Sequence, residues 1–203
     1  MNTIDYGPAI ESIALAIDEG RLSDAREIAF GMPRRIKRSK ISRPSPDPIT
    51  QHQIGGVRKY NERDLMSLFR RDGFIDRYTG LRLVTPPALR AISVLIPDAF
   101  PFHPNWKEGA CHDSYWDLSA TADHVKPVAE GGQDDIENLV STCMSVNLQK
   151  NSISLEELGW KLFPVGSDSE WDGLSGFFLS QCERQPVLLE TQYFKDWFRA
   201  VES

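Results

Sequence analysis

Residues 122–151 constrain the fold of this chain more than any other segment, because they combine turn-forming and reactive residues in a fixed order. Their sequence is ADHVKPVAEGGQDDIENLVSTCMSVNLQKN. From Trp116 to Asp123 apolar and polar residues alternate, which indicates a strand, and a glycine-containing loop follows. Asn-Leu at 138–139 begins a second strand-like stretch, and a short helix is expected after it. The segment therefore predicts two strands, a connecting loop and a helix.

This order resembles the motif of the HNH endonuclease family. The matching positions keep the family spacing over 28 residues without a gap, and they are Asp123, His124, Pro127, Gly131, Gly132, Asn138, Leu139, Cys143, Asn147 and Lys150. The resemblance implies an α+β fold, with a ββα-metal core at about 116–151 embedded in a mostly helical domain that has an N-terminal helical extension.

The resemblance also implies chemical roles. Phosphodiester hydrolysis needs an activated water and stabilisation of charge on the phosphate. His124 corresponds to the general base, and Asn138 to the residue that orients it through the neighbouring backbone. Asp123 and Asn147 correspond to the ligands of one divalent cation, and their oxygen atoms suit Mg²⁺ or Mn²⁺. Because neighbours in a strand point to opposite faces, Asp123 and His124 are expected on different sides of the strand.

Each of these residues also has a structural interpretation. Asp-His can end a strand, Asn138 can form a turn, Gly131-Gly132 can form a hairpin, and Lys150 can be a solvated helix terminus. Taken singly, every residue except His124 is more typical of a structural role, and it is their joint occurrence that favours the active site.

Other residues are candidates for contacts with nucleic acid. They are Lys150, Lys126 and His112 in or near the motif, and Arg34, Arg35, Lys37, Arg38 and Lys40 in the run RRIKRSKISR. Such a basic run is also typical of a solvated tether, and both interpretations remain open.

The chain departs from the family at a second metal site. Many members brace the ββα unit with zinc held by two Cys-x-x-Cys pairs. Here Cys143 has Val146 where its partner would stand, and Asp76 and Thr79 occupy the place of the upstream pair. We therefore expect no structural zinc. The brace is expected to be hydrophobic, built from Phe74, Tyr78, Leu83, Val146 and the aromatic loop at 99–106.

A different zinc site remains an alternative, formed by His103, Cys111, His112 and Cys143. The adjacent Cys111-His112 pair suits tetrahedral geometry poorly, so buried thiols and polar loop histidines are the favoured interpretation. The chain has 3 cysteines, an odd number at irregular spacing, which fits thiols in a reducing compartment.

The formal net charge of −6 argues against a nucleic-acid partner only if its distribution is ignored. Residues 1–32 and 151–203 are acidic, whereas residues 33–113 carry 15 Lys or Arg against 8 Asp or Glu, a net charge of +7. A basic middle segment can still bind phosphates. The sequence has neither a run of about 20 apolar residues nor a signal-peptide pattern, so we expect a soluble, cytoplasmic protein without membrane contact.

The pattern along the chain predicts three parts. Residues 1–32 form a helical hairpin with helices near 8–19 and 23–31, residues 33–60 form a basic linker rich in proline and serine, and residues 61–203 form the nuclease domain with C-terminal helical elaboration. Further helices are expected at 61–71 and 86–96, and in the last two of the amphipathic segments 155–163, 171–181 and 190–201.

Two functions follow as hypotheses. The first is a metal-dependent endonuclease in restriction, defence or a mobile element, with DNA preferred over RNA as substrate and homodimer formation left open. The second is a catalytically silent HNH-like module that binds nucleic acid or a protein. The complete set of base and ligand residues favours the first.

Overall fold

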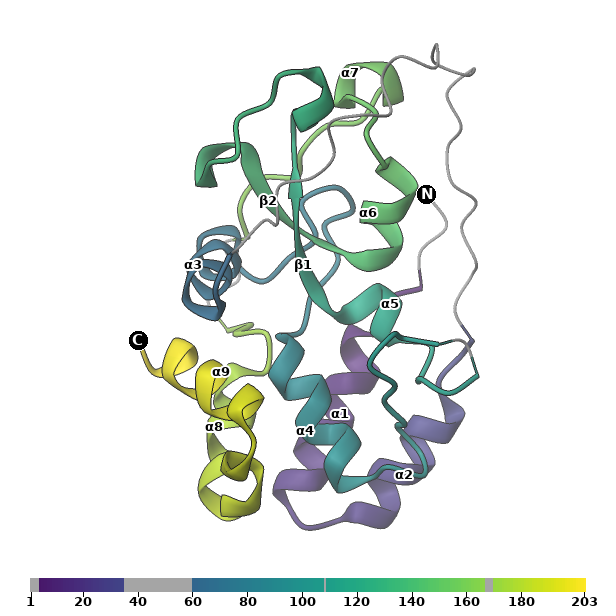
Figure 1. The fold of residues 1–203 in the computed structure, drawn as a ribbon. Coiled ribbons are helices and arrows are strands. Elements are labelled where there is room, and N and C mark those ends of the chain that lie inside the picture. The colour runs from purple at the N-terminus through teal and green to yellow at the C-terminus, as the bar shows by residue number, and fades with distance from the viewer. Residues whose placement is uncertain (1–3, 35–59, 108, 167–169) are drawn as a thin grey trace.

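The computed structural model describes residues 4–34, 60–107, 109–166 and 170–203, and Figure 1 shows their arrangement. These residues form many short helices around one small sheet. The mixture of helices and strands expected from the sequence is therefore confirmed. None of the helices in these ranges is long and apolar enough to cross a membrane.

The sheet consists of two short antiparallel strands, β1 (Ala120–His124) and β2 (Leu139–Cys143). Their register runs from Ala120 opposite Cys143 to His124 opposite Leu139. The connection contains two 3-10 turns, η2 (Val128–Glu130) and η3 (Ile136–Asn138). Helix α6 (Met144–Lys150) follows β2 directly and packs against both strands, so that it runs back along β1 toward the Asp-His end.

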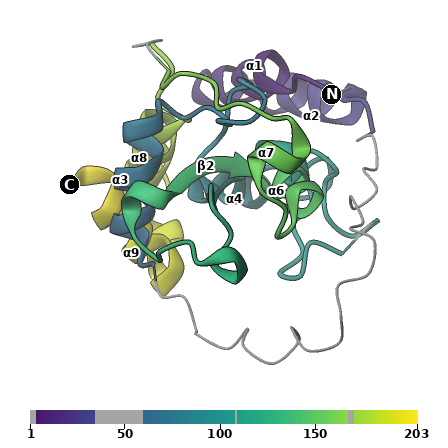
Figure 2. The same ribbon diagram turned by 90° about the horizontal axis from the view of Figure 1, so that it is seen from above.

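Helix α3 (Glu62–Asp72) supports β2 from the other side, and Figure 2 shows β2 passing between α3 and the α6 region. The helix begins where expected, because Asn61 and Asp64 form a capping box, and it ends at Gly73 with a φ of 71°. Its last residue, Asp72, is buried and accepts a hydrogen bond from the Ser141 backbone N at 2.7 Å. This carboxylate fixes α3 to the middle of β2.

The remaining helices surround this centre. They are α1 (Gly7–Asp18), α2 (Leu22–Gly31), α4 (Pro86–Leu95), α5 (Tyr115–Leu118), α7 (Leu155–Leu158), α8 (Ser175–Arg184), η4 (Pro186–Glu190) and α9 (Gln192–Glu202). The predicted hairpin of α1 and α2, the helix after Pro86 and the last two C-terminal helices are all present.

One hydrophobic cluster runs through the described residues, from the α1–α2 hairpin to α9. Tyr6, Ile10 and Ile13 belong to the same cluster as Phe69 and Phe178. The predicted hairpin at 1–32 therefore packs on the body of the protein. Most of the predicted linker at 33–60 lies outside the described residues, so its structure stays a prediction.

The prediction of a strand from Trp116 was wrong at its start. Residues 115–118 form the short helix α5, and the strand begins at Ala120. Tyr115 and Leu118 are both buried three residues apart, and the Leu118 backbone N donates to the Ser114 oxygen at 2.8 Å. The alternation of apolar residues is too short here to separate a strand from one helical turn.

The segment at 171–181 also begins its helix later than the pattern suggests. Trp171 is buried ahead of α8, with its indole Nε1 donating to the Leu83 oxygen at 2.9 Å. Leu174 then adopts a φ of 61° and precedes Ser175. The tryptophan is thus a core anchor before the helix instead of part of it.

Candidate active site

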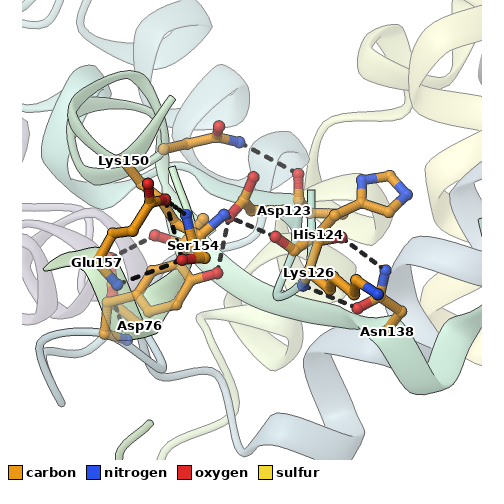
Figure 3. Close-up of polar contacts among 12 residues, drawn as sticks. Asp76, Asp123, His124, Lys126, Asn138, Lys150, Ser154 and Glu157 are labelled. Carbon is orange, nitrogen blue, oxygen red and sulfur yellow. Dashed lines mark hydrogen bonds and ion pairs between the residues drawn. The ribbon is translucent and has the colours of Figure 1, made fainter. Parts of the chain in front are cut away.

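Asp123 and His124 end β1 and point to opposite sides of the strand. Figure 3 shows the Asp123 carboxylate directed toward Lys150 and the His124 ring directed away from it. The β pairing of His124 with Leu139 places this strand end beside the start of β2. The alternation expected from the sequence thus separates two chemically different surroundings.

Asp123 is held by two donors on a single oxygen. Its Oδ2 accepts a hydrogen bond from the Tyr78 hydroxyl at 2.7 Å and lies 2.9 Å from the Lys150 Nζ. Burial and the nearby Asp123 carboxylate raise the pKa of Tyr78, so its hydroxyl stays protonated as a donor. Because both donors approach Oδ2, the second carboxylate oxygen, Oδ1, is oriented away from them.

Lys150 was expected to be an exposed residue that could contact phosphate, but it is buried. Its side chain is 1% exposed, and its Nζ also donates to the His124 backbone oxygen at 2.7 Å. A buried ammonium is stable only with close partners, which Asp123 and this carbonyl provide. We therefore correct its interpretation: Lys150 is an internal partner of the Asp-His pair and not a surface group.

Asn147 approaches the strand from α6, one turn before Lys150. Its Nδ2 donates to the Ala122 oxygen at 3.2 Å, and the residue is partly buried. Residues three apart lie on the same face of a helix, so Asn147 and Lys150 both face β1. With Nδ2 engaged by the strand, the amide oxygen of Asn147 is directed to the other side.

His124 contacts the loop between the strands. The side chain is 6% exposed, and its Nε2 lies 2.7 Å from Asp134 Oδ1. The Tyr60 hydroxyl donates to the same oxygen of Asp134. Neither Asp134 nor Tyr60 was identified in the sequence, because neither is a matching position of the motif and Tyr60 is 74 residues from Asp134.

Asn138 holds the backbone that follows His124. Its Oδ1 accepts from the Lys126 backbone N at 2.9 Å, and its Nδ2 donates to the Lys126 oxygen at 3.0 Å and the Gln133 oxygen at 2.8 Å. Figure 3 shows the pair of contacts with Lys126. The amide thus binds both polar groups of a residue two positions beyond the histidine, in line with the orienting role expected for it.

Gly132 is required by this arrangement. A Cβ at this position would lie 2.0 Å from the Lys126 oxygen and 2.9 Å from the Asn138 Nδ2. No real side chain tolerates such an approach to backbone. The second glycine of the motif is therefore a packing requirement of the loop that carries Asn138.

Asp76 stands where the sequence analysis places the family's upstream zinc ligands. Its carboxylate is buried and accepts from the Cys143 backbone N and the Thr142 hydroxyl on Oδ2, both at 2.9 Å. On Oδ1 it accepts from the backbone N of Tyr78 at 2.9 Å and of Thr79 at 3.0 Å. Burial raises the pKa of the Asp76 carboxyl, and its hydrogen bonds with Cys143, Tyr78 and Thr142 act in the opposite direction.

Asp76 therefore joins the turn at 76–79 to the point where β2 becomes α6. The sequence led to an expectation of a hydrophobic brace. The apolar members are buried as expected, namely Phe74, Tyr78, Leu83, Val146 and, from the aromatic loop, Phe100. The polar centre of the brace was missed, since a lone aspartate in a turn gives no sign of partners more than 60 residues away.

The residues of the alternative zinc site do not meet. Across residues 4–34, 60–107, 109–166 and 170–203, no group of three or more His, Cys, Asp or Glu side chains is placed to hold a metal ion. All three cysteines are within these ranges, are buried, and form no disulfide there.

His112 lies away from the Asp-His pair. Its Nδ1 is 2.7 Å from the Ser114 hydroxyl, its Nε2 is 3.3 Å from the Ala29 oxygen at the end of α2, and its ring stacks on Phe100. Burial lowers the pKa of His112, which favours the neutral ring. These contacts correct the expectation of a nucleic-acid contact at His112, because both ring nitrogens are engaged within the protein, Nδ1 by Ser114 and Nε2 by α2.

The other candidate contacts differ in what the structure describes. Lys126 and Arg34 are exposed. The rest of the predicted basic group, Arg35, Lys37, Arg38 and Lys40, lies outside the described residues. Their role as phosphate contacts stays a prediction.

The donor set fits a divalent cation. Asp123 Oδ1 and the Asn147 amide oxygen are the oxygen ligands that Mg²⁺ and Mn²⁺ accept, and both come from groups whose other polar atom is already engaged by the protein. The Lys150 charge compensates part of the Asp123 charge. A cation held by these two oxygens would need water and substrate oxygens for its remaining positions.

Comparison with known families agrees with this geometry. Residues 109–152 match the family model described as HNH endonuclease. No protein with curated function and no solved structure matches the chain. The matched range contains β1, the connecting loop, β2 and α6. The resemblance noted in the sequence is therefore confirmed: residues 109–152 are similar to the HNH endonuclease family.

Proposed function

We propose that the chain is a metal-dependent HNH endonuclease that hydrolyses phosphodiester bonds in DNA. The observation that carries the proposal is that the last two residues of β1, Asp123 and His124, point to opposite sides of the strand. The Asp123 carboxylate faces Lys150 on α6, the helix that also carries Asn147, while His124 faces the opposite side and its ring contacts the loop. A module that only binds nucleic acid has no need for a separated base and ligand pair.

The residues of the chain supply two parts of the reaction. His124 accepts the proton of the attacking water, since a neutral imidazole is a suitable base near neutral pH. Asp123 Oδ1 and the Asn147 amide oxygen would hold the cation. When bound, Mg²⁺ or Mn²⁺ stabilises negative charge on the phosphate and on the leaving oxygen.

Positioning of the base comes from the surrounding backbone. Asn138 fixes Lys126 on one side of His124, and Lys150 fixes the His124 carbonyl itself. The histidine is thus held at its main chain from two directions. Such restraint supports catalysis, because small errors in the position of a base are costly to the rate.

DNA is proposed as the substrate because the family match points to it and because residues 33–113 carry a net charge of +7. Lys126 is exposed directly beyond His124, where a phosphate beside the active site would lie. Among biological roles, restriction, defence and mobile-element functions all use such an enzyme.

Incubation of supercoiled plasmid with the full chain tests the proposal. We expect nicked or linear DNA with Mg²⁺ or Mn²⁺ and intact plasmid with EDTA. A parallel incubation with RNA measures the preference for DNA. If the plasmid stays intact with both metals while the protein retards it in a gel, the chain is instead the catalytically silent binding module.

A further inference from the structure

The contact between His124 and Asp134 links the proposed base to a residue that is not among the matching positions of the motif. Asp134 Oδ1 lies 2.7 Å from His124 Nε2, and Asp134 stands in the loop just before η3. A carboxylate can only accept a hydrogen bond unless it is protonated, so the imidazole must donate through Nε2. The neutral ring then carries its hydrogen on Nε2 and its lone pair on Nδ1.

The Asp134 carboxylate has a second anchor. Its side chain is 51% exposed, which alone would leave it free to rotate into solvent. The Tyr60 hydroxyl, however, donates to the same Oδ1 atom that His124 contacts. Two donors from positions 64 residues apart, 60 and 124, thus converge on one oxygen and fix its location.

We propose that Asp134 is a positioning residue that holds His124 in the Nε2–H tautomer, with Nδ1 as the atom that accepts the proton of water, and that Tyr60 keeps Asp134 in place. This inference rests on the proposed nuclease function for its catalytic part. Its structural part, the tautomer, concerns the protein without substrate and stands independently.

The arrangement gives the contact between Tyr60 and the loop a role. It also distinguishes Asp134 from its neighbour Asp135, whose carboxylate accepts from the Asn138 backbone N at 3.0 Å and so caps η3. Of these adjacent acids, one shapes the loop and the other contacts the histidine. Carboxylates that orient an imidazole are a general device for selecting its tautomer.

The first test is long-range ¹H–¹⁵N NMR on the ¹⁵N-labelled full chain, at a pH where imidazole is neutral. The chain has 4 histidines, and His124→Ala identifies the resonances of His124. We expect the Nε2–H tautomer in the wild type and a mixture of tautomers in Asp134→Ala. Glu137→Ala, an exposed acid in the same loop, is the matched control and should keep the wild-type pattern.

The second test is kinetic. Asp134→Ala should lower kcat by about 10- to 100-fold with little change in KM, and Tyr60→Phe should give a smaller loss of the same kind. Equal kcat in wild type and Asp134→Ala would overturn the proposal. Faster cleavage by the variant would overturn it too, because Asp134 would then block the access of substrate or water to His124. A wild type that does not cleave at all contradicts the proposed function instead, and leaves the tautomer measurement to decide the structural part.

Discussion

The Lys150 Nζ lies 2.9 Å from Asp123 Oδ2 and 2.7 Å from the His124 backbone oxygen, so one buried lysine holds both residues of the Asp-His pair. The lysine comes from the last turn of α6, the helix that also carries Asn147. The strand end and the helix are therefore fixed to each other at the active site. The same contacts therefore maintain the geometry of the site and contribute to the stability of the fold.

Replacing Lys150 with methionine should destabilise the protein by about 3–5 kcal/mol, because Asp123 would remain buried without its charged partner. Urea unfolding followed by circular dichroism measures the change. Lys161→Met is the matched control, since Lys161 is exposed, and its effect should stay within about 0.5 kcal/mol. Wild-type stability of Lys150→Met would show that the lysine is not a buried counter-ion.

Asp76→Asn should destabilise the protein by about 2 kcal/mol or more, even though the side chains have similar shapes. Each carboxylate oxygen of Asp76 accepts two hydrogen bonds. In asparagine one of these oxygens becomes an NH₂ group, which would face two donors and could not accept from them. Thermal unfolding measures the effect. Asp98→Asn, which alters an exposed ion pair with Arg26, should leave the unfolding temperature nearly unchanged. Equal effects of the two variants would contradict the role of Asp76 as a brace.

Gly132→Ala should reduce cleavage strongly, because the added methyl group would displace the Lys126 backbone that Asn138 holds. Gly31→Ala is the control, since a Cβ there meets nothing within 4 Å. Plasmid cleavage and thermal unfolding are compared for both. If Gly132→Ala cuts DNA as fast as Gly31→Ala, the close approach of residues 126 and 132 is not needed for the site.

Asp123→Ala and Asn147→Ala should each weaken Mn²⁺ or Mg²⁺ binding, because each removes one of the two proposed protein ligands. Calorimetric titration in the presence of uncleavable DNA gives the affinity, and the metal concentration needed for half-maximal cleavage gives a second measure. Unchanged values in both variants would remove these residues from the metal site.

Much of the local structure was predictable from the sequence. The start of α3 at the Asn61 cap and its end at Gly73 follow from residues within one turn of each boundary. The separation of Asp123 and His124 follows from the alternation of a strand. These features depend on neighbours in the chain, and such neighbours are visible in a sequence.

The remaining features depend on distant partners. Asp76 accepts hydrogen bonds from Thr142 and Cys143, and Asp134 accepts one from Tyr60. Because these partners are distant in the sequence, the role of neither carboxylate could be predicted from it. Lys150 was misinterpreted for the same reason. A lysine at the end of a helix is typically exposed, and only the position of β1 beside α6 makes this one a buried partner.

The most direct test of the account is the rate of plasmid cleavage by His124→Ala with saturating Mg²⁺. The variant should lose about 10²- to 10⁴-fold in rate while it unfolds at nearly the wild-type temperature and still binds DNA, since the histidine moves a proton in the proposed reaction. His103→Ala, a histidine in the aromatic loop, should cut DNA at the wild-type rate. Cleavage by His124→Ala at more than about a tenth of the wild-type rate would contradict the assignment of His124 as the base.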